Sequence, residues 1–156
     1  MIGTLNETQV NALLDRILYG HLGCQAGGKL YVVPISFARD GDILYGHTTD
    51  GLKIDIMREN PNVCVQVDEV KDLAEWESAI VWGRYEELKG KDEIEAMVKL
   101  IDRYGPIFDT IPDADERGRD VAPPRLDGRA AHHVLYRVKI TEKSGRFETK
   151  STKAEM

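Results

Sequence analysis

Tight turns, rather than helices, join several of the strand-like segments of this chain, and this feature narrows the possible folds more than any other. The segments Ala26–Lys29 and Asp40-Gly41 are turn sequences, and each stands between two β-rich apolar runs. Such short turns connect neighbouring antiparallel strands, whereas parallel strands need long crossover connections. We therefore expect a mainly antiparallel sheet and not a βαβ sheet.

The predicted elements are short and fill a single domain over residues 1–156. Runs with a period of two predict strands over 19–24, 30–37, 43–47, 62–68, 78–88 and 133–141. Helical spacing of apolar residues predicts helices over 7–18, 51–60 and 92–104. These elements predict a mainly β (α+β) fold, a six-stranded antiparallel barrel with inserted helices. We expect an acidic excursion from the sheet over 69–77 and a flexible tail over 143–156. Residues 105–131 are expected to form a long loop, which is mobile or borders the ligand cleft over 105–129.

Composition argues against several classes of protein. The chain has 42% hydrophobic and 31% charged residues and a net charge of −6, so it lacks the basic surface of a nucleic-acid or membrane-surface binder. No apolar run approaches the roughly 20 residues that span a bilayer. The first residues, MIGTLNETQV, do not resemble a signal peptide, so we expect a cytoplasmic location and no membrane or nucleic-acid partner.

The cysteines and histidines do not form a metal-binding pattern. Cys24 and Cys64 lie in apolar stretches, which predicts buried reduced thiols, although a redox pair stays possible. His132 and His133 are adjacent on a predicted strand, so their side chains point to opposite faces. We therefore predict no metal site. Glycine-rich nucleotide-binding motifs are absent from the sequence as well.

The segment HTTDGLK, residues 47–53, connects a predicted strand to a predicted helix. His47, Thr48 and Thr49 supply side-chain donors, and Lys53 adds a charge in the first helical turn. Backbone N–H groups and the helix dipole also favour an anion at such a junction. The alternative is that the segment is only a polar turn.

Two other segments are candidates for binding a ligand. LYVVPISF reads as a core strand, but Pro34 removes a backbone donor and leaves neighbouring backbone groups for another partner. Ser36 is a candidate to assist in binding that partner. Trp76 and Ser78 stand at the mouth of a strand, where Trp76 is also explained as a cover for the core.

In order along the chain, four segments resemble the pyridoxamine 5'-phosphate oxidase-like family, and most closely its 5-nitroimidazole-resistance (Nim-type) branch. They are GHLGC, YVVPISF, DGDILYGHTTDGLKIDIMRENPNVCVQVD and WESAIVWGRYEEL. The resemblance covers about residues 5–145. It implies a split β-barrel that binds flavin mononucleotide (FMN) between the two subunits of a homodimer.

The resemblance also implies roles for individual residues. The strand along the isoalloxazine ring contains Val33, Pro34, Ile35 and Ser36, and the phosphate segment contains His47, Thr48, Thr49, Gly51, Leu52 and Lys53. Ser78 is expected to reach the flavin from the next strand, and Arg146 is a candidate for a contribution from the partner subunit.

The expected activity is that of an oxidoreductase, in which the flavin takes electrons from a nicotinamide donor and passes them to a small acceptor such as a nitroaromatic. No protein acid or base is evident, and His47 is the best candidate. The polar residues from 143 onward lack the arginine- and histidine-bearing signature of a true pyridoxamine 5'-phosphate oxidase, so we do not expect that reaction. The alternative is a non-catalytic flavin- or heme-binding protein, with His21 or His132 as the axial heme ligand.

Overall fold

The computed structural model describes residues 1–108 and 132–150, and within them the chain forms eight strands and three helices. The strands are β1 Ile2–Thr4, β2 Gly20–Ala26, β3 Lys29–Ile35, β4 Ala38–Asp40, β5 Ile43–Thr49, β6 Asn62–Asp72, β7 Glu75–Glu87 and β8 His133–Glu148. The helices are α1 Glu7–Arg16, α2 Leu52–Glu59 and α3 Lys91–Phe108. The sequence predicted six of these strands and all three helices; it missed the short strands β1 and β4.

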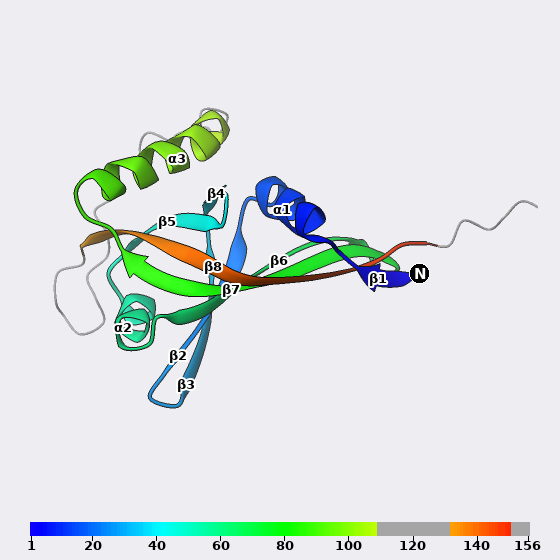
Figure 1. The fold of residues 1–156 in the computed structure, drawn as a ribbon, viewed down its shortest axis with the longest axis horizontal. Coiled ribbons are helices and arrows are strands. Elements are labelled where there is room, and N and C mark those ends of the chain that lie inside the picture. The colour runs from blue at the N-terminus through cyan, green and yellow to red at the C-terminus, as the bar shows by residue number, and fades with distance from the viewer. Residues whose placement is uncertain (109–131, 151–156) are drawn as a thin grey trace, which may run out of the picture.

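All strands belong to one sheet, in which every pair is antiparallel, as the turn sequences predicted. The order is β3-β2-β6-β7-β8-β5-β4, and β1 pairs with the far end of β8. Figure 1 shows the β2–β3 hairpin projecting away from the rest of the sheet, with α3 lying over β5 and β8. β3 is an edge strand, which is where a proline inside a strand is tolerated.

The sheet curls around one main core. Ile35 of β3, Leu44 of β5 and Val81 of β7 belong to the same buried cluster, although their strands lie far apart in the sheet order. Only a curved sheet brings such strands to one core, so the sheet forms a barrel. No pairing joins β3 to β4 among the described residues, and the barrel is therefore split along that seam.

Tyr136 of β8 illustrates how closely the barrel is packed. Its ring lies over Gly46 of β5, where an added Cβ would be 2.3 Å from the ring. Only glycine leaves room at this position. The Tyr136 side chain is 2% exposed, and its hydroxyl has no hydrogen-bond partner.

Helix α1 begins with a complete capping box. The Asn6 side chain accepts a hydrogen bond from the backbone N–H of Gln9, and the Gln9 side chain accepts one from the backbone N–H of Asn6. Val10, Leu13 and Leu14 are buried against the barrel, as the apolar spacing predicted. The helix ends two residues earlier than predicted.

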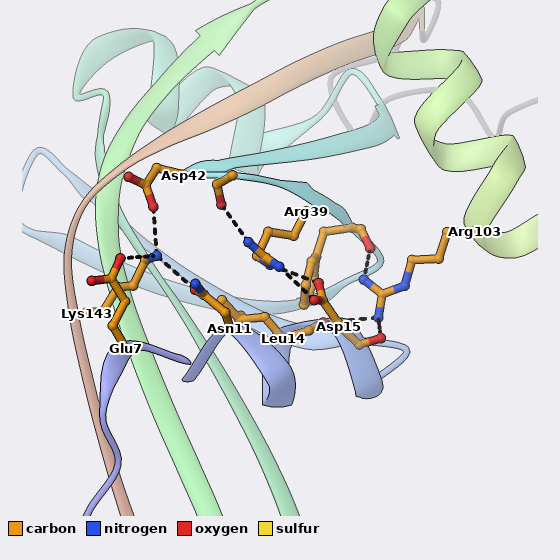
Figure 2. Close-up of polar contacts among 10 residues, drawn as sticks. Glu7, Asn11, Leu14, Asp15, Arg39, Asp42, Arg103 and Lys143 are labelled. Carbon is orange, nitrogen blue, oxygen red and sulfur yellow. Dashed lines mark hydrogen bonds and ion pairs between the residues drawn. The ribbon is translucent and has the colours of Figure 1, made fainter. Parts of the chain in front are cut away.

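The carbonyl groups at the end of α1 are bound by an arginine of α3 (Figure 2). Arg103 donates to the carbonyls of Leu14 at 3.1 Å, Asp15 at 3.3 Å and Ile17, and its other amino group donates to Phe37 at 2.6 Å. The last carbonyls of a helix have no partner within the helix. Arg103 therefore caps α1 and ties it to α3 and to the connection between β3 and β4.

A lysine ties the beginning of α1 to the sheet. Lys143 of β8 donates to Asn11 at 2.8 Å and Asp42 at 2.7 Å, and it contacts Glu7 at 3.4 Å (Figure 2). Its side chain is only 10% exposed. The hydrogen bond from Lys143 is the main cause of a lowered pKa at the Asp42 carboxylate.

Helix α3 is longer than predicted and buries a different face. It continues through Pro106 to Phe108, so residues 105–108 of the expected loop are helical, and residues 109–131 lie outside the described part. Ala96 and Leu100 are buried against the sheet. Four large side chains, Ile94, Met97, Val98 and Ile101, stay 37–67% exposed. No helix in the described ranges is long and apolar enough to cross a bilayer.

Two further sequence predictions are corrected by strand pairing. The acidic segment 69–77 is not an excursion, because β6 continues to Asp72 and β7 begins at Glu75. The last strand does not end at residue 141. β8 continues to Glu148, pairing with β7 and β1, so residues 143–148 of the expected flexible tail are part of the sheet.

Candidate functional site

The segment 47–53 connects β5 to α2, as predicted. Ile54 and Met57 are fully buried in the barrel core, so they fix how α2 enters the molecule. The helix ends at Glu59, and Pro61 follows two residues later. This packing holds the first turn of α2 next to the end of β5.

The first turn of α2 differs from that of α1 in lacking a cap. Gly51 occupies the N-cap position and has no side chain to accept a hydrogen bond from the helix. Thr48 and Thr49 immediately precede this turn and are partly buried. The Thr48 hydroxyl donates only a long hydrogen bond, 3.3 Å, to the Thr49 carbonyl. Hydroxyl groups and backbone N–H groups therefore converge at this junction.

Lys53 brings a cation to the same turn. Its side chain is half-buried, and burial lowers the pKa of its ammonium group, while the nearby Cys24 thiol acts weakly in the other direction. No acidic side chain of the described residues pairs with this ammonium. The donor set of hydroxyls, backbone N–H groups and an unpaired cation fits a phosphate group.

His47 points to the side of β5 that faces α3. Its ring stacks on that of His133, with Nε2 of His47 3.1 Å from Nδ1 of His133. Burial lowers the pKa of His47, and the nearby His133 and Lys53 lower it further. Ser36 lines the same hollow of about 370 Å3 as His47, so the structure brings these two predicted residues together.

The strand predicted to follow a flavin ring presents two different faces. Val33 and Ile35 pack against the main core, whereas Pro34 and Ser36 are exposed. Side-chain contacts to a ligand are therefore open to Pro34 and Ser36, whereas the side chains of Val33 and Ile35 are directed into the core. Because β3 is an edge strand, one row of its backbone groups faces away from the sheet.

Ser78 lies apart from these residues. It lines a second hollow of about 380 Å3, whose lining also includes Gln66, Trp76 and Arg146. Gln66 donates hydrogen bonds to the Ser78 hydroxyl at 3.2 Å and to Asp68 at 3.1 Å. Ser78 and Arg146 are direct cross-strand partners, so these two predicted residues are brought together.

An apolar hollow on the outer face of the sheet was missed by sequence reasoning. It measures about 500 Å3, and its lining includes Leu30, Val32, Cys64 and Trp82. Leu30 is 81% exposed and Val32 is 67% exposed. The signal for it is in the sequence: LYVV is apolar at consecutive positions, which is typical of a strand covered on both faces.

The thiols and the remaining histidines do not form a joint site. Cys24 is buried and Cys64 half-buried, and both are free. Cys64 pairs with Gly23, so Cys24 points to the opposite face of the sheet, which disfavours a disulfide. His21 is exposed opposite Pro34. In the described ranges no three His, Cys, Asp or Glu residues are grouped to hold a metal ion.

Comparisons with known proteins agree with this architecture. The family described as pyridoxamine 5'-phosphate oxidase matches residues 6–147. An uncharacterized protein of Rhizobium meliloti (strain 1021) is 32% identical over 125 residues, covering 80% of this chain and 81% of the relative.

Two crystal structures extend the comparison. A FAD-binding protein from Mesorhizobium loti is 29% identical, with a TM-score of 0.76 over 96% of this chain and 98% of that one. A candidate 5-nitroimidazole antibiotic resistance protein from Bacteroides thetaiotaomicron is 19% identical, with a TM-score of 0.66 over 94% of this chain and 89% of that one. The second likeness concerns the fold alone.

Proposed function

Because this chain belongs to the pyridoxamine 5'-phosphate oxidase family, we propose that it is a homodimeric flavoprotein that binds FMN. We propose further that it is an oxidoreductase of Nim-like type, acting in the cytoplasm on a small acceptor. The phosphate would be held at the junction of β5 and α2, and the ring along β3. The similarity to a FAD-binding protein at 29% identity supports a flavin as the ligand.

The observation that carries this proposal is that the Lys53 ammonium is half-buried and has no acidic partner among the described residues. A lysine ammonium that loses part of its hydration without gaining an anionic partner is unfavourable for the folded protein. Placing it beside an uncapped helix start and two threonine hydroxyls adds further donors that lack strong acceptors. A phosphate dianion would satisfy all of them at once, which supports a phosphate-bearing ligand.

The residues of β3 suit the ring of a flavin. The edge strand offers outward backbone groups, and Pro34 on the strand and Ser36 just after it are exposed. When bound, a flavin supplies hydride and electron transfer, here from a nicotinamide donor to a small acceptor such as a nitroaromatic. The chain's own residues would bind and orient the ring. No side chain is assigned as a catalytic acid or base.

The exposed apolar hollow on the outer face of the sheet supports a homodimer. Leu30 and Val32 belong to an edge strand, and an exposed apolar edge strand is prone to pair or pack with another chain. Burying this face against a second copy would also bring Ser78 and Arg146 near a partner's surface. Sedimentation of the FMN-bound protein as a monomer would contradict this part of the proposal.

A flavin titration of the wild type, Lys53→Ala and Lys91→Ala tests the proposed function. Lys91 is the matched control, because it is an exposed lysine in the first turn of α3. A charge-assisted hydrogen bond is worth roughly 1.5–3 kcal/mol, so Lys53→Ala should weaken FMN binding by about ten- to a hundredfold. Riboflavin, which lacks the phosphate, should bind the wild type and Lys53→Ala with similar affinity.

The same titrations separate the alternatives. Equal FMN affinity in the wild type and Lys53→Ala would remove Lys53 from the site, and equal losses for FMN and riboflavin would indicate a ring contact or a folding defect. Much tighter binding of FAD than of FMN would make the dinucleotide the cofactor. A Soret band in the purified protein, in place of flavin absorbance, would favour heme.

A further inference from the structure

The stacked pair of His47 and His133 joins two strands at the proposed phosphate site. The rings lie 5.1 Å apart with an interplanar angle of 16°, and the contact between Nε2 and Nδ1 is 3.1 Å. In the sheet, Thr49 pairs with His133 and His47 with Leu135, so the histidines are diagonal neighbours. Such a contact needs one nitrogen to donate and the other to accept. It therefore requires that at least one ring is neutral.

In the free protein, the groups around the pair disfavour protonation of His47 to the imidazolium. Lys53 of α2 acts on His47 as a nearby positive charge, and burial disfavours the imidazolium as well. From α3, Tyr104 lines the same hollow, but its hydroxyl group already donates to backbone carbonyls. The nearest acidic residue in sequence, Asp50, forms an ion pair with Arg58 at 3.6 Å.

We propose that His133 is a phosphate-binding residue of this site, and that the His47–His133 pair takes up a proton when the phosphate of a flavin nucleotide binds. This inference rests on the proposed function. A dianionic phosphate beside the pair replaces the repulsion from Lys53 with attraction, so the imidazolium becomes favourable. The proton comes from the solvent, and both histidines and Lys53 then face the anion as donors.

The pH dependence of binding follows from this proton uptake. A ligand that binds with uptake of a proton binds more tightly as the pH falls, by at most tenfold per pH unit for one proton. Above the pKa of the pair in the complex, no proton is taken up and this contribution disappears. The phosphate itself gains a proton only near pH 6, which affects every variant equally.

FMN titrations at pH 6.5, 7.5 and 8.5 test the inference in the wild type, His133→Asn and His132→Asn. Asparagine at position 133 keeps a side-chain nitrogen near the place of Nδ1 but cannot take up a proton. His132 is the matched control, because it is the adjacent exposed histidine and contributes its backbone carbonyl to Asp50. Riboflavin serves as the ligand without phosphate.

The wild type should bind FMN several-fold more tightly for each unit of falling pH, and His132→Asn should match it. His133→Asn should equal the wild type at pH 8.5, and it should bind about tenfold more weakly at pH 6.5. Isothermal titration at pH 7 in two buffers of different ionisation enthalpy should show proton uptake in the wild type and none in His133→Asn. The same pH dependence and proton uptake in His133→Asn would overturn the inference while leaving the flavin site intact. FMN binding to none of the proteins would overturn the proposed function as well.

Discussion

Helices α1 and α2 are both packed against the barrel, yet their ends are treated differently. The first turn of α1 is closed by the Asn6–Gln9 capping box, and its last carbonyls are bound by Arg103. The first turn of α2 has Gly51 at its N-cap and receives no side-chain hydrogen bond. An uncapped helix end costs stability. The open first turn of α2 carries this cost, whereas the capped ends of α1 do not.

The cations beside the two helices show the same contrast. Arg103 and Lys143 lose water but gain carbonyl and carboxylate oxygens, as Figure 2 shows. Lys53 loses water and gains no acidic partner among the described residues. A partly buried cation that has hydrogen-bond acceptors stabilises the fold. One that has no anionic partner destabilises the fold until an anionic ligand binds. Replacing each of the three by methionine, which has a similar length and no charge, tests this distinction.

Of the three methionine substitutions, Arg103→Met should have the largest effect. The substitution leaves the carbonyls of Leu14, Asp15 and Ile17, at the partly buried end of α1, without this donor. We expect the free energy of unfolding to fall by about 3 kcal/mol, because buried acceptors left unpaired carry a full desolvation penalty. Urea unfolding measures it. Arg103→Lys should recover part of the loss, and a loss below about 1 kcal/mol in Arg103→Met would break the comparison.

A smaller loss of about 1 kcal/mol is expected for Lys143→Met. Lys143 is well covered, but its partners Glu7 and Asp42 are 71% and 67% exposed, and exposed ion pairs contribute little. The matched measurement is urea unfolding at pH 7 alongside Lys139→Met, whose lysine is 51% exposed. A loss as large as that in Arg103→Met would show that exposure of the partners does not weaken this contact.

The Lys143 contribution should also depend on pH. Lys143 holds the pKa of Asp42 below its ordinary value of 3.8, so this interaction stabilises the protein fully above that value. It is lost as the pH falls through the lowered pKa of the folded protein. The difference in stability between the wild type and Lys143→Met should therefore be constant from pH 7 to about 5 and shrink below about 4. A difference that grows on acidification would refute this assignment.

Of the three methionine substitutions, Lys53→Met should have the smallest effect and the only one of opposite sign. Removing a half-buried ammonium without an acidic partner should stabilise the ligand-free protein by about 1 kcal/mol or less. Saturating FMN should reverse the order, because ligand binding stabilises the wild type more. Thermal unfolding with and without FMN measures both. If ligand-free Lys53→Met is clearly less stable than the wild type, then Lys53 supports the fold as the other two cations do.

Two further substitutions, outside the three cations, test the core that both helices cover. The Tyr136 hydroxyl is buried without a partner, so Tyr136→Phe should be neutral or stabilise the protein by up to about 1 kcal/mol. Gly46→Ala, at the position beneath the ring, should be strongly destabilising because the added methyl overlaps Tyr136. Chemical unfolding of both variants compares them directly. Destabilisation by Tyr136→Phe would show that the hydroxyl has a partner after all.

The sequence predicted the local features of this contrast better than the distant ones. Turn chemistry predicted the antiparallel sheet, and the spacing of apolar residues predicted α2 with Lys53 in its first turn. The assignment of flavin contacts to residues 47–53 stays a prediction. Periodicity reports only neighbours along the chain, so it could not reveal that Arg103 reaches Ile17, 86 positions away, or that His133 reaches His47 across the sheet.

The missed half of β8 has a similar cause. Residues 143–148, KSGRFE, are polar and contain a glycine, so they lack the alternation that predicts a strand. They form one because β7 and β1 offer backbone partners on either side. The same reasoning explains α3. Its large apolar residues suggested the buried face, but the sheet has room for the face that carries the smaller Ala96.

The position of β8 also determines when this chain can fold. Among the strands of residues 1–108 and 132–150, β8 is made last, yet it lies between β7 and β5 in the sheet. Before it is synthesised, the sheet can exist only as two separate parts, β3-β2-β6-β7 and β5-β4, each with an open edge. Pairings between segments so far apart in the chain form slowly, and open edges favour aggregation while they wait. The barrel therefore closes only after β8 has been synthesised. Aggregation of the chain during overproduction at high temperature should occur mainly before this closure.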